Sequence, residues 1–318
     1  MKKFIFKIFY NLFLVFIFHL CFSFFIYFSE LGINDNTSHF ISEQKAGVNH
    51  NLIIGDSRSL AGIDPIQISQ NYLSISLPGS TFVEGYAMLN RVLQESQVDT
   101  VILCYGQSHF ERSDYFESLI KSCRIIYNFK TLLELNKLEE KTNSNYTLKN
   151  GTLKLYDKIR RFLIYFCIIE RETSFGKVVY NTIHQNKIKS KLLKQKGHIL
   201  LGQNDSTAIA NEESKEIDFL THPIIETYFY KIDQLCKQKK IVVFFISPPV
   251  SKISYNSNLN YYIGYKSKIQ EFKNNSNVIF LNSVDVYDNK CFGDNSHLNK
   301  YGCDKFTNDI KLFITCKL

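Results

Sequence analysis

A serine directly after an apolar run is the first feature of the sequence that could do chemistry. Gly55-Asp56-Ser57-Arg58 follows the run 51–54, which is typical of a buried strand. A serine on a sharp turn from such a strand into a helix exposes its hydroxyl at the sheet edge, and its own backbone N–H can point at a developing oxyanion. The alternative is that Asp56 or Ser57 only caps the helix that follows.

An aspartate and a histidine near the C-terminus supply the groups that such a serine would need. Asp294 and His297 are three residues apart, just before the last helical stretch. A neutral imidazole can take the proton of a serine hydroxyl, and a carboxylate can fix its tautomer and stabilise the imidazolium. The alternative is that His297 is an ordinary surface histidine near a helix start.

The elements that must position these residues alternate between strands and helices. Apolar runs predict strands at 51–55, 73–77, 98–105, 240–246 and 278–281. Helical spacing predicts helices at 82–93, 223–237, 262–272 and 300–313. Alternating strands and helices indicate an α/β fold with a parallel sheet that is covered on both faces. Functional side chains then gather at the carboxyl ends of the strands.

The N-terminal segment 8–29 carries no charged residue and is long enough to cross a ~30 Å hydrocarbon core as a helix. Lys2, Lys3 and Lys7 precede it and Glu30 follows it. The positive-inside rule therefore predicts a single-pass transmembrane helix with a cytoplasmic N-terminus and an extracytoplasmic remainder, periplasmic or at the cell surface. A cleaved signal peptide is the alternative, but its apolar core would be shorter and would end in small residues.

These features divide the chain into five predicted parts. They are an anchor with its flanks at 1–30, a stalk at 31–45, the first part of the α/β domain at 46–111, a helical insertion or cap at 112–218, and the second part of the domain at 219–318.

The formal net charge of +8 does not by itself indicate a nucleic-acid partner. No helix-turn-helix, zinc-finger or RNA-binding aromatic signature accompanies the charge, so we expect no nucleic acid to bind. A lysine cluster at 187–196 is typical of a solvated helix face, with contact to anionic lipid or glycan as the alternative. A chain that is 45% hydrophobic and 21% charged excludes wholesale disorder.

The eight cysteines match no zinc-binding pattern, so no metal site is expected. Cys104 and Cys167 lie in apolar runs and are interpreted as small core hydrophobes. Cys291 and Cys303 flank the Asp294–His297 cluster, and a disulfide between them in an oxidising compartment is a hypothesis.

Several motifs occur in one order along the chain. They are Gly55-Asp56-Ser57-Arg58, Leu77-Pro78-Gly79-Ser80, Ser247-Pro248-Pro249, and the segment 294–302, which contains Asp294-x-x-His297. Together they resemble the SGNH/GDSL hydrolase superfamily, and within it the membrane-anchored bacterial branch associated with O-acylation of cell-surface polysaccharides. The resemblance covers about 46–110 and 220–318 and implies a flavodoxin-like three-layer sandwich, the SGNH hydrolase fold.

The resemblance also implies roles for individual residues. Ser57 would be the nucleophile, His297 the general base and then acid, and Asp294 its orienting partner. The backbone N–H groups of Ser57 and Gly79 would form the oxyanion hole.

The third motif of that family, Gly-x-Asn-Asp, is incomplete here. The corresponding strand ends in Gly106-Gln107-Ser108-His109, so the asparagine that supplies a side-chain donor is missing. Gln107 or Ser108 would substitute for it, or the donor is absent. His109, a single histidine after a core strand, is assigned a structural role.

Arg58 directly follows the proposed nucleophile. Its planar, permanently charged guanidinium suits a carboxylate or phosphate of a substrate, which makes it a candidate substrate-binding residue. The alternative is a salt bridge to Asp56 or Asp64 that locks the turn.

The expected function is that of a serine-dependent carbohydrate O-acyltransferase or esterase that acts on a cell-surface polysaccharide without metal or cofactor. The substrate partner would be a cell-surface glycan or acylated saccharide. Because acyl-coenzyme A is not available outside the cytoplasm, a transferase would need a membrane-bound O-acyltransferase partner to pass the acyl group across. The alternative is a non-catalytic glycan-binding or assembly protein on the same fold, which the missing asparagine favours.

Overall fold

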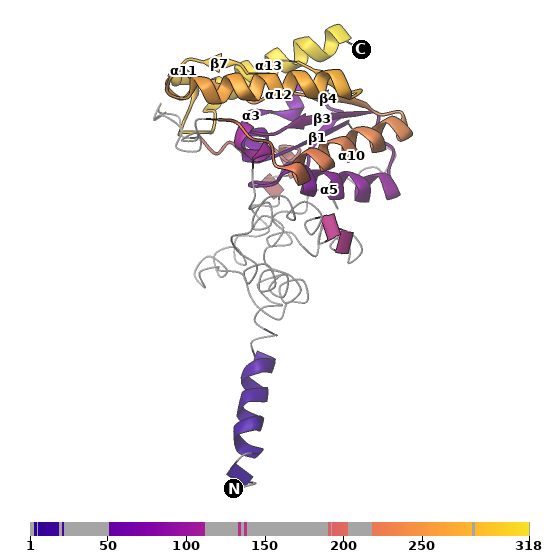
Figure 1. Ribbon diagram of the computed structural model, residues 1–318, viewed down its shortest axis with the longest axis vertical. Coiled ribbons are helices and arrows are strands. Elements are labelled where there is room, and N and C mark those ends of the chain that lie inside the picture. The colour runs from indigo at the N-terminus through magenta and orange to yellow at the C-terminus, as the bar shows by residue number, and fades with distance from the viewer. Residues whose placement is uncertain are drawn as a thin grey trace. The chain divides into compact units, whose positions relative to one another are not determined.

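A five-stranded parallel sheet forms the centre of the fold (Figure 1). Its strands are β1 (Asn51–Gly55), β2 (Tyr72–Ser74), β3 (Thr100–Cys104), β4 (Val242–Phe245) and β6 (Ile279–Phe280). They lie in the order β2-β1-β3-β4-β6, and every pairing is parallel. The order reverses between β1 and β3, and open α/β sheets bind ligands at the carboxyl ends of the strands that flank such a reversal.

The computed structural model describes residues 3–4, 6–18, 21, 51–111, 133–134, 137–138, 190–191, 193–202, 218–281 and 284–317. Its contacts divide the chain into two units, Met1–Asp35 with Leu119–Ser190, and Asn36–Ser118 with Lys191–Leu318. The sheet and the site described below belong to the second unit. The predicted stalk at 31–45 and most of the predicted insertion at 112–218 lie outside the described residues.

Helices connect the strands. They are α3 (Ser57–Gly62), α4 (Pro65–Ile68), α5 (Phe82–Glu95), α10 (Pro223–Lys239), α11 (Lys252–Ser257), α12 (Leu259–Asn275) and α13 (Lys300–Lys317), with the 3-10 turns η1 (Gln107–Phe110) and η3 (Asn289–Cys291). Helix α5 begins with a capping box between Thr81 and Glu84, and α10 begins with Pro223 in its first turn. Strands β5 (Val250–Ser251) and β7 (Val286–Tyr287) form a separate parallel pair.

One face of the sheet is covered by aromatic side chains from α5, α10 and α12, among them Phe82, Phe229 and Phe272. Phe245 of β4 faces this layer, where its ring centroid lies 6.4 Å from that of Phe82 and 6.5 Å from that of Phe229. Phe229 stacks on Phe272 at 4.4 Å. Edge-to-face and offset packing of this kind adds to the free energy gained by burying the rings.

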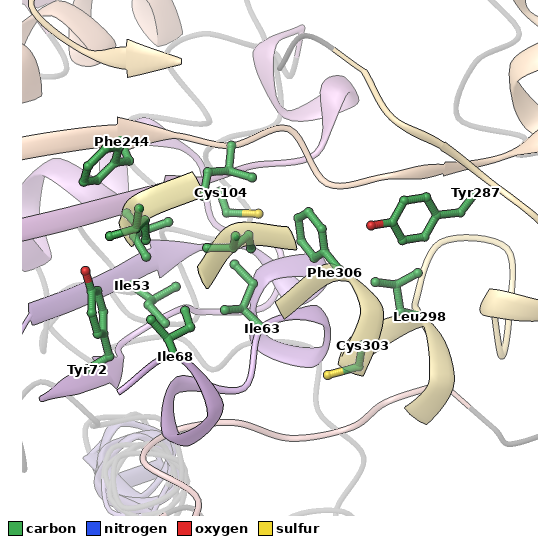
Figure 2. Packing of buried hydrophobic residues seen from close by; sticks show 14 of the residues in the cluster. Ile53, Ile63, Ile68, Tyr72, Cys104, Phe244, Tyr287, Leu298, Cys303 and Phe306 are labelled. Carbon is green, nitrogen blue, oxygen red and sulfur yellow. The ribbon is translucent and has the colours of Figure 1, made fainter. Parts of the chain in front are cut away.

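The opposite face packs against α3, α4 and α13. Because side chains alternate along a strand, Ile53, Ile102 and Phe244 point away from the aromatic layer and join Phe306 and Ile310 of α13 (Figure 2). Helices on both faces make the arrangement compatible with a three-layer sandwich.

The predicted α/β class and parallel sheet are confirmed. All five predicted strands and all four predicted helices are present, with ends that differ by a few residues. The helix that follows Ser57, α3, was also expected, whereas the β5–β7 pair, α4 and α11 were not predicted, because such short elements show little periodicity.

Residues 6–18 of the N-terminal segment are helical, whereas 19–20 and 22–29 of the predicted span lie outside the described residues. Among the residues that the structure describes, no helix has both the length and the apolar character needed to cross a membrane.

The segment 193–202, which the sequence assigned to the insertion, contacts the first part of the domain. The carbonyl of Lys196 accepts a hydrogen bond from Ser74 N of the edge strand β2, at 2.9 Å, and Ile199 N donates to the Leu60 carbonyl of α3, at 3.2 Å. This segment therefore helps to fix α3.

The first turn of α13 tests how tightly the C-terminal part is packed. A Cβ on Gly302 would lie 2.1 Å from the Cys291 carbonyl oxygen, so Gly302→Ala must displace backbone. We expect urea denaturation to show a loss of about 1–3 kcal/mol in the free energy of unfolding.

Gly62→Ala is the matched control, because a Cβ there would meet Leu298 Cδ1 at an ordinary 3.4 Å. We expect this variant to change the free energy of unfolding by less than about 1 kcal/mol. Equal stability of the two variants would contradict the close approach of α13 to η3.

Candidate functional site

Ser57 is the first residue of α3, at the carboxyl end of β1. Asp56 is the N-cap, and its Oδ1 accepts hydrogen bonds from Arg58 N at 2.8 Å and Ser59 N at 3.3 Å. Asp56 thus does cap the helix, and this leaves the Ser57 side chain half-buried and without a hydrogen bond to any described residue. Capping and presentation of the hydroxyl are compatible functions of the same turn.

The second oxygen of Asp56 joins β1 to β3. Asp56 Oδ2 accepts from Gly106 N at 2.8 Å and lies 2.9 Å from His109 Nε2. The carboxyl group is completely buried. Burial alone would raise the pKa of Asp56, but the charge and hydrogen bond of His109, the charge of Arg58 and the Gly106 N–H together lower that pKa far below its usual range.

Gln107 and Arg58 extend this connection to β4. Arg58 Nη1 donates to Gln107 Oε1 at 2.9 Å, and Gln107 Nε2 donates to the Pro248 carbonyl at 3.0 Å. Both side chains are buried. Arg58 therefore has a side-chain partner within the protein, Gln107, and its positive charge also lowers the pKa of Asp56. The amide of Gln107, a predicted oxyanion donor, is held in place by these two contacts.

The turn that contains Gly79 is tied to the same strand end. Ser80 N donates to the Leu77 carbonyl at 3.0 Å, and Gly79 has φ of 75°, as the third residue of a type II turn requires. Ser80 Oγ donates to the Gly55 carbonyl at 2.8 Å. His109 Nδ1 lies 2.7 Å from the Ser80 carbonyl oxygen. The predicted oxyanion donors Ser57 and Gly79 thus lie on two loops that are cross-linked by hydrogen bonds.

Asp294 and His297 form the predicted pair. Their loop is closed by a bridge between Phe292 and Leu298 and by a hydrogen bond from Gly293 N to the His297 carbonyl, at 3.0 Å. His297 Nδ1 lies 2.8 Å from Asp294 Oδ2, and His297 N donates to Asp294 Oδ1 at 2.7 Å.

Burial raises the pKa of Asp294, but hydrogen bonds from Ser296 N, His297 N and the His297 ring outweigh it and lower that pKa. An ionised Asp294 accepts a hydrogen bond from the Nδ1–H group, and in this tautomer of the neutral imidazole Nε2 is the acceptor nitrogen. Nε2 is buried and has no hydrogen-bond partner in the described part of the chain. The hydrogen bond between His297 and Ser57 is therefore not made.

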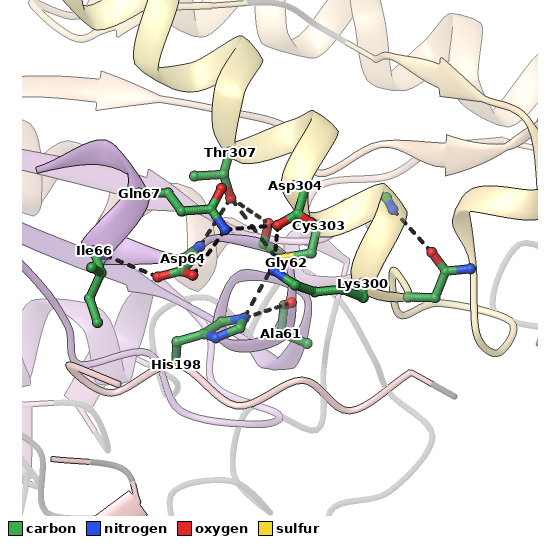
Figure 3. A network of polar contacts seen from close by, with 12 residues as sticks. Ala61, Gly62, Asp64, Ile66, Gln67, His198, Lys300, Cys303, Asp304 and Thr307 are labelled. Atoms are coloured by element: carbon green, nitrogen blue, oxygen red, sulfur yellow. Dashed lines mark hydrogen bonds and ion pairs between the residues drawn. The ribbon is translucent and has the colours of Figure 1, made fainter. Parts of the chain in front are cut away.

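Packing of α3 against α13 joins the two halves of the site (Figure 3). Thr307 Oγ1 lies 3.0 Å from Asp64 N, which donates to it, and 3.4 Å from the Gly62 carbonyl. Gln67 Nε2 donates to Asp304 Oδ1 at 2.7 Å. Helix α13 begins three residues after His297, so these contacts fix the loop of His297 relative to the helix that begins at Ser57.

The structure contradicts the suggested disulfide, since Cys291 and Cys303 are both free thiols. The reason is that Cys303 faces α3, with its Sγ 3.6 Å from His198 Nε2 and 4.0 Å from Thr307 Oγ1 (Figure 3). Burial raises the pKa of Cys303 to about 12. Cys104 is fully buried, as predicted, while Cys167 lies outside the described residues.

Neither a family model nor a curated protein matches this sequence. The described residues contain no group of three His, Cys, Asp or Glu side chains that could hold a metal ion. The site thus combines the half-buried hydroxyl of Ser57, the backbone N–H groups of the Ser57 and Gly79 loops, and His297 with Nε2 as its acceptor nitrogen.

Two features of the site were missed by the sequence analysis. His109 contacts the loops of both Ser57 and Gly79, although its position after a strand indicated only a structural role. Asp56 was expected at most to cap a helix or pair with Arg58. The signal that could have found both is a buried carboxylate and a histidine at the ends of adjacent parallel strands.

The lowered pKa of Asp56 predicts a pH dependence of stability. As pH falls through the ordinary value of 3.8, the unfolded chain takes up a proton at Asp56 before the folded chain does, so the stabilisation from the ionised carboxylate is progressively lost. Asp56→Asn keeps a capping oxygen but removes the charge. We expect urea denaturation at pH 7 to give this variant a much lower free energy of unfolding than the wild type. We expect the difference to become smaller as pH falls below about 4. A deficit independent of pH would contradict the buried ionised carboxylate.

Proposed function

We propose that this chain is a membrane-anchored, extracytoplasmic carbohydrate O-acyltransferase or esterase of SGNH type. The strand order corresponds to the 2-1-3-4-5 order of flavodoxin-like sheets, with Ser57 beside the reversal between β1 and β3. The observation that carries the proposal is His297, whose Nδ1 is bound to Asp294 and whose buried Nε2 has no partner among the described residues. A general base for a serine needs this acceptor nitrogen.

In the first step Ser57 Oγ attacks the acyl carbonyl carbon, and its proton passes to His297 Nε2. The N–H groups of Ser57 and Gly79 stabilise the oxyanion, and the remaining amide hydrogen of Gln107 is available as a third donor. The bond from the acyl carbon to the oxygen of the donor then breaks, and the departing alcohol takes the proton from His297. The contact between Ser57 and His297 forms when substrate binds, since such contacts are commonly loose without it.

In the second step an acceptor hydroxyl releases the acyl group from Ser57. It gives its proton to His297 Nε2 and attacks the acyl carbon. The bond between that carbon and Ser57 Oγ then breaks, and His297 returns the proton to Ser57 Oγ. A sugar hydroxyl makes the reaction a transfer, and water makes it hydrolysis. The acceptor is a cell-surface glycan, and in the transferase a membrane-bound O-acyltransferase supplies the acyl group.

The N-terminal helix supports membrane anchoring. Its apolar side chains are exposed, for example Phe9 at 67%, Leu12 at 59% and Phe13 at 58%. Exposing so many apolar side chains to water raises the free energy of the helix, whereas the same side chains are stable in lipid. We propose that 8–29 is a single transmembrane span with the α/β domain on the extracytoplasmic side.

A non-catalytic glycan-binding protein remains the second candidate. The observation that favours it is the missing hydrogen bond between Ser57 and His297, together with the absence of asparagine at the end of β3. A binding protein has no requirement for an ionised partner on His297, so the Asp294 contact favours the enzyme.

Removal of the Ser57 hydroxyl tests the proposal. The full-length chain in detergent micelles is assayed for acetate release from a small aryl ester. We expect Ser57→Ala to lower the rate by about 10³-fold or more, because no other hydroxyl is presented at this turn. Ser276→Ala is the control, since its hydroxyl bonds the Phe272 carbonyl at the end of α12, and its rate should equal that of the wild type. Equal rates for wild type and Ser57→Ala would leave the binding protein as the function.

The orienting role of Asp294 has its own test. Asp294→Asn keeps the size of the side chain but no longer fixes the acceptor tautomer of His297, so we expect kcat to fall by about 10²–10⁴-fold. Asp288→Asn is the matched control, because Asp288 only caps η3 by accepting from Lys290 N at 3.1 Å, which an asparagine oxygen can also do. An unchanged kcat in Asp294→Asn would remove this residue from the mechanism.

A further inference from the structure

His109 is a buried histidine that the chemistry above does not use. Its ring lies on η1, 6% exposed, between the two loops that carry the proposed machinery. Nε2 contacts Asp56, the residue before Ser57, at 2.9 Å, and Nδ1 contacts the carbonyl of Ser80, the residue after Gly79, at 2.7 Å. One side chain therefore connects the nucleophile loop with the second oxyanion loop.

Both ring nitrogens of His109 face oxygen atoms that accept. The Ser80 carbonyl can only accept, so Nδ1 carries a hydrogen. The contact between Nε2 and Asp56 Oδ2 also needs one proton. With that proton on the ring, the contact is a buried pair of carboxylate and imidazolium, and a charge-assisted hydrogen bond of this kind is stronger than one between neutral groups.

The charges around Asp56 matter for the reaction as well as for the fold. A buried carboxylate beside Ser57 would by itself oppose the negative charge that develops on the acyl oxygen. His109 and Arg58 compensate it, and the three groups together carry one positive charge. Cys104, Tyr105 and Tyr265 also face Asp56, but burial raises the pKa of each of them, so they stay neutral.

We propose that His109 is a positioning residue which, through Asp56 and Ser80, aligns the Ser57 hydroxyl with the backbone N–H groups of Ser57 and Gly79 and offsets the charge of Asp56. The proposal rests on the proposed function. It is more specific than a packing role, because it requires a protonated ring and a functional dependence on the pair with Asp56.

The experiment compares His109→Asn, Asp56→Asn and the double variant in the full-length chain, with the same aryl ester. The side chain of asparagine can still donate toward Ser80 but is too short to reach Asp56. We expect each single variant to lower kcat by about 10–100-fold with KM changed by less than about threefold, because a displacement of about 1 Å costs rate more than binding. We expect the kcat of the double variant to equal that of each single variant, because the two residues act as a unit.

His198→Asn is the matched control. His198 is equally buried, at 6%, and its Nε2 contacts the Ala61 carbonyl at the other end of α3 at 3.2 Å. We expect this variant to keep the wild-type kcat. An equal loss in His109→Asn and His198→Asn would show that any buried histidine serves as well, and would overturn the proposal.

Nitrogen-15 spectroscopy of the ring gives a readout that does not depend on activity. We expect both nitrogens of His109 to be protonated at neutral pH in the wild type, and this signature to be lost in Asp56→Asn. A neutral ring in the wild type would overturn the proposal even if a variant failed to fold.

If Ser57→Ala is inactive while His109→Asn keeps its kcat, positioning by His109 is wrong and the proposed function stands. If Ser57→Ala retains the wild-type rate, the proposed function is wrong, and the proposal about His109 falls with it.

Discussion

The burial of one carboxylate, Asp56, constrains the rest of the site. An ionised group without solvent is tolerated only where hydrogen bonds and opposite charges replace water. Here two N–H groups of α3 bind one oxygen, while Gly106 N and His109 bind the other. These partners come from the ends of β1 and β3, so the electrostatic requirement of a single group holds the two strand ends in one arrangement and thereby fixes the backbone on which Ser57 lies.

Two carboxylate–histidine pairs in the described part of the chain, Asp56–His109 and Asp294–His297, differ in burial and in the contacts of the ring nitrogens. Asp56 is fully buried and His109 has acceptors at both nitrogens, so neither group can exchange a proton without breaking the pair. Asp294 is 44% exposed in its side chain, and His297 has an acceptor at Nδ1 alone. The first pair suits a fixed scaffold. The second can gain and lose a proton at Nε2, which proton transfer to and from a substrate requires.

Much of the fold follows from the sequence because its signals are local. Apolar runs such as 242–245 indicate buried strands, and the spacing in 300–313 indicates a helix. The Asp294–His297 contact was likewise predictable from a separation of three residues. The position of His109 between Asp56 and Ser80 was not predictable, because it depends on β1 and β3 being neighbours and on Ser80 lying beside both. That Cys303 is a free thiol was also not predictable, because its contact with His198 depends on the packing of α13 on α3, which joins residues far apart in the sequence.

The unmade contact between Ser57 and His297 fits the way in which the domain is held together. Helix α13 is held against the end of α3 by Thr307 and by the packing of Leu298 beside Gly62, and against α4 by Gln67, so all of these contacts lie away from Ser57. The loop of Asp294 and His297 is closed on itself by the Phe292–Leu298 bridge. Rotation of the Ser57 side chain can therefore occur without disturbing the backbone that Asp56 fixes, the core or the Asp294 pair. A buried nitrogen without a partner is costly, so a ligand or the serine hydroxyl that satisfies Nε2 lowers the free energy of the bound state.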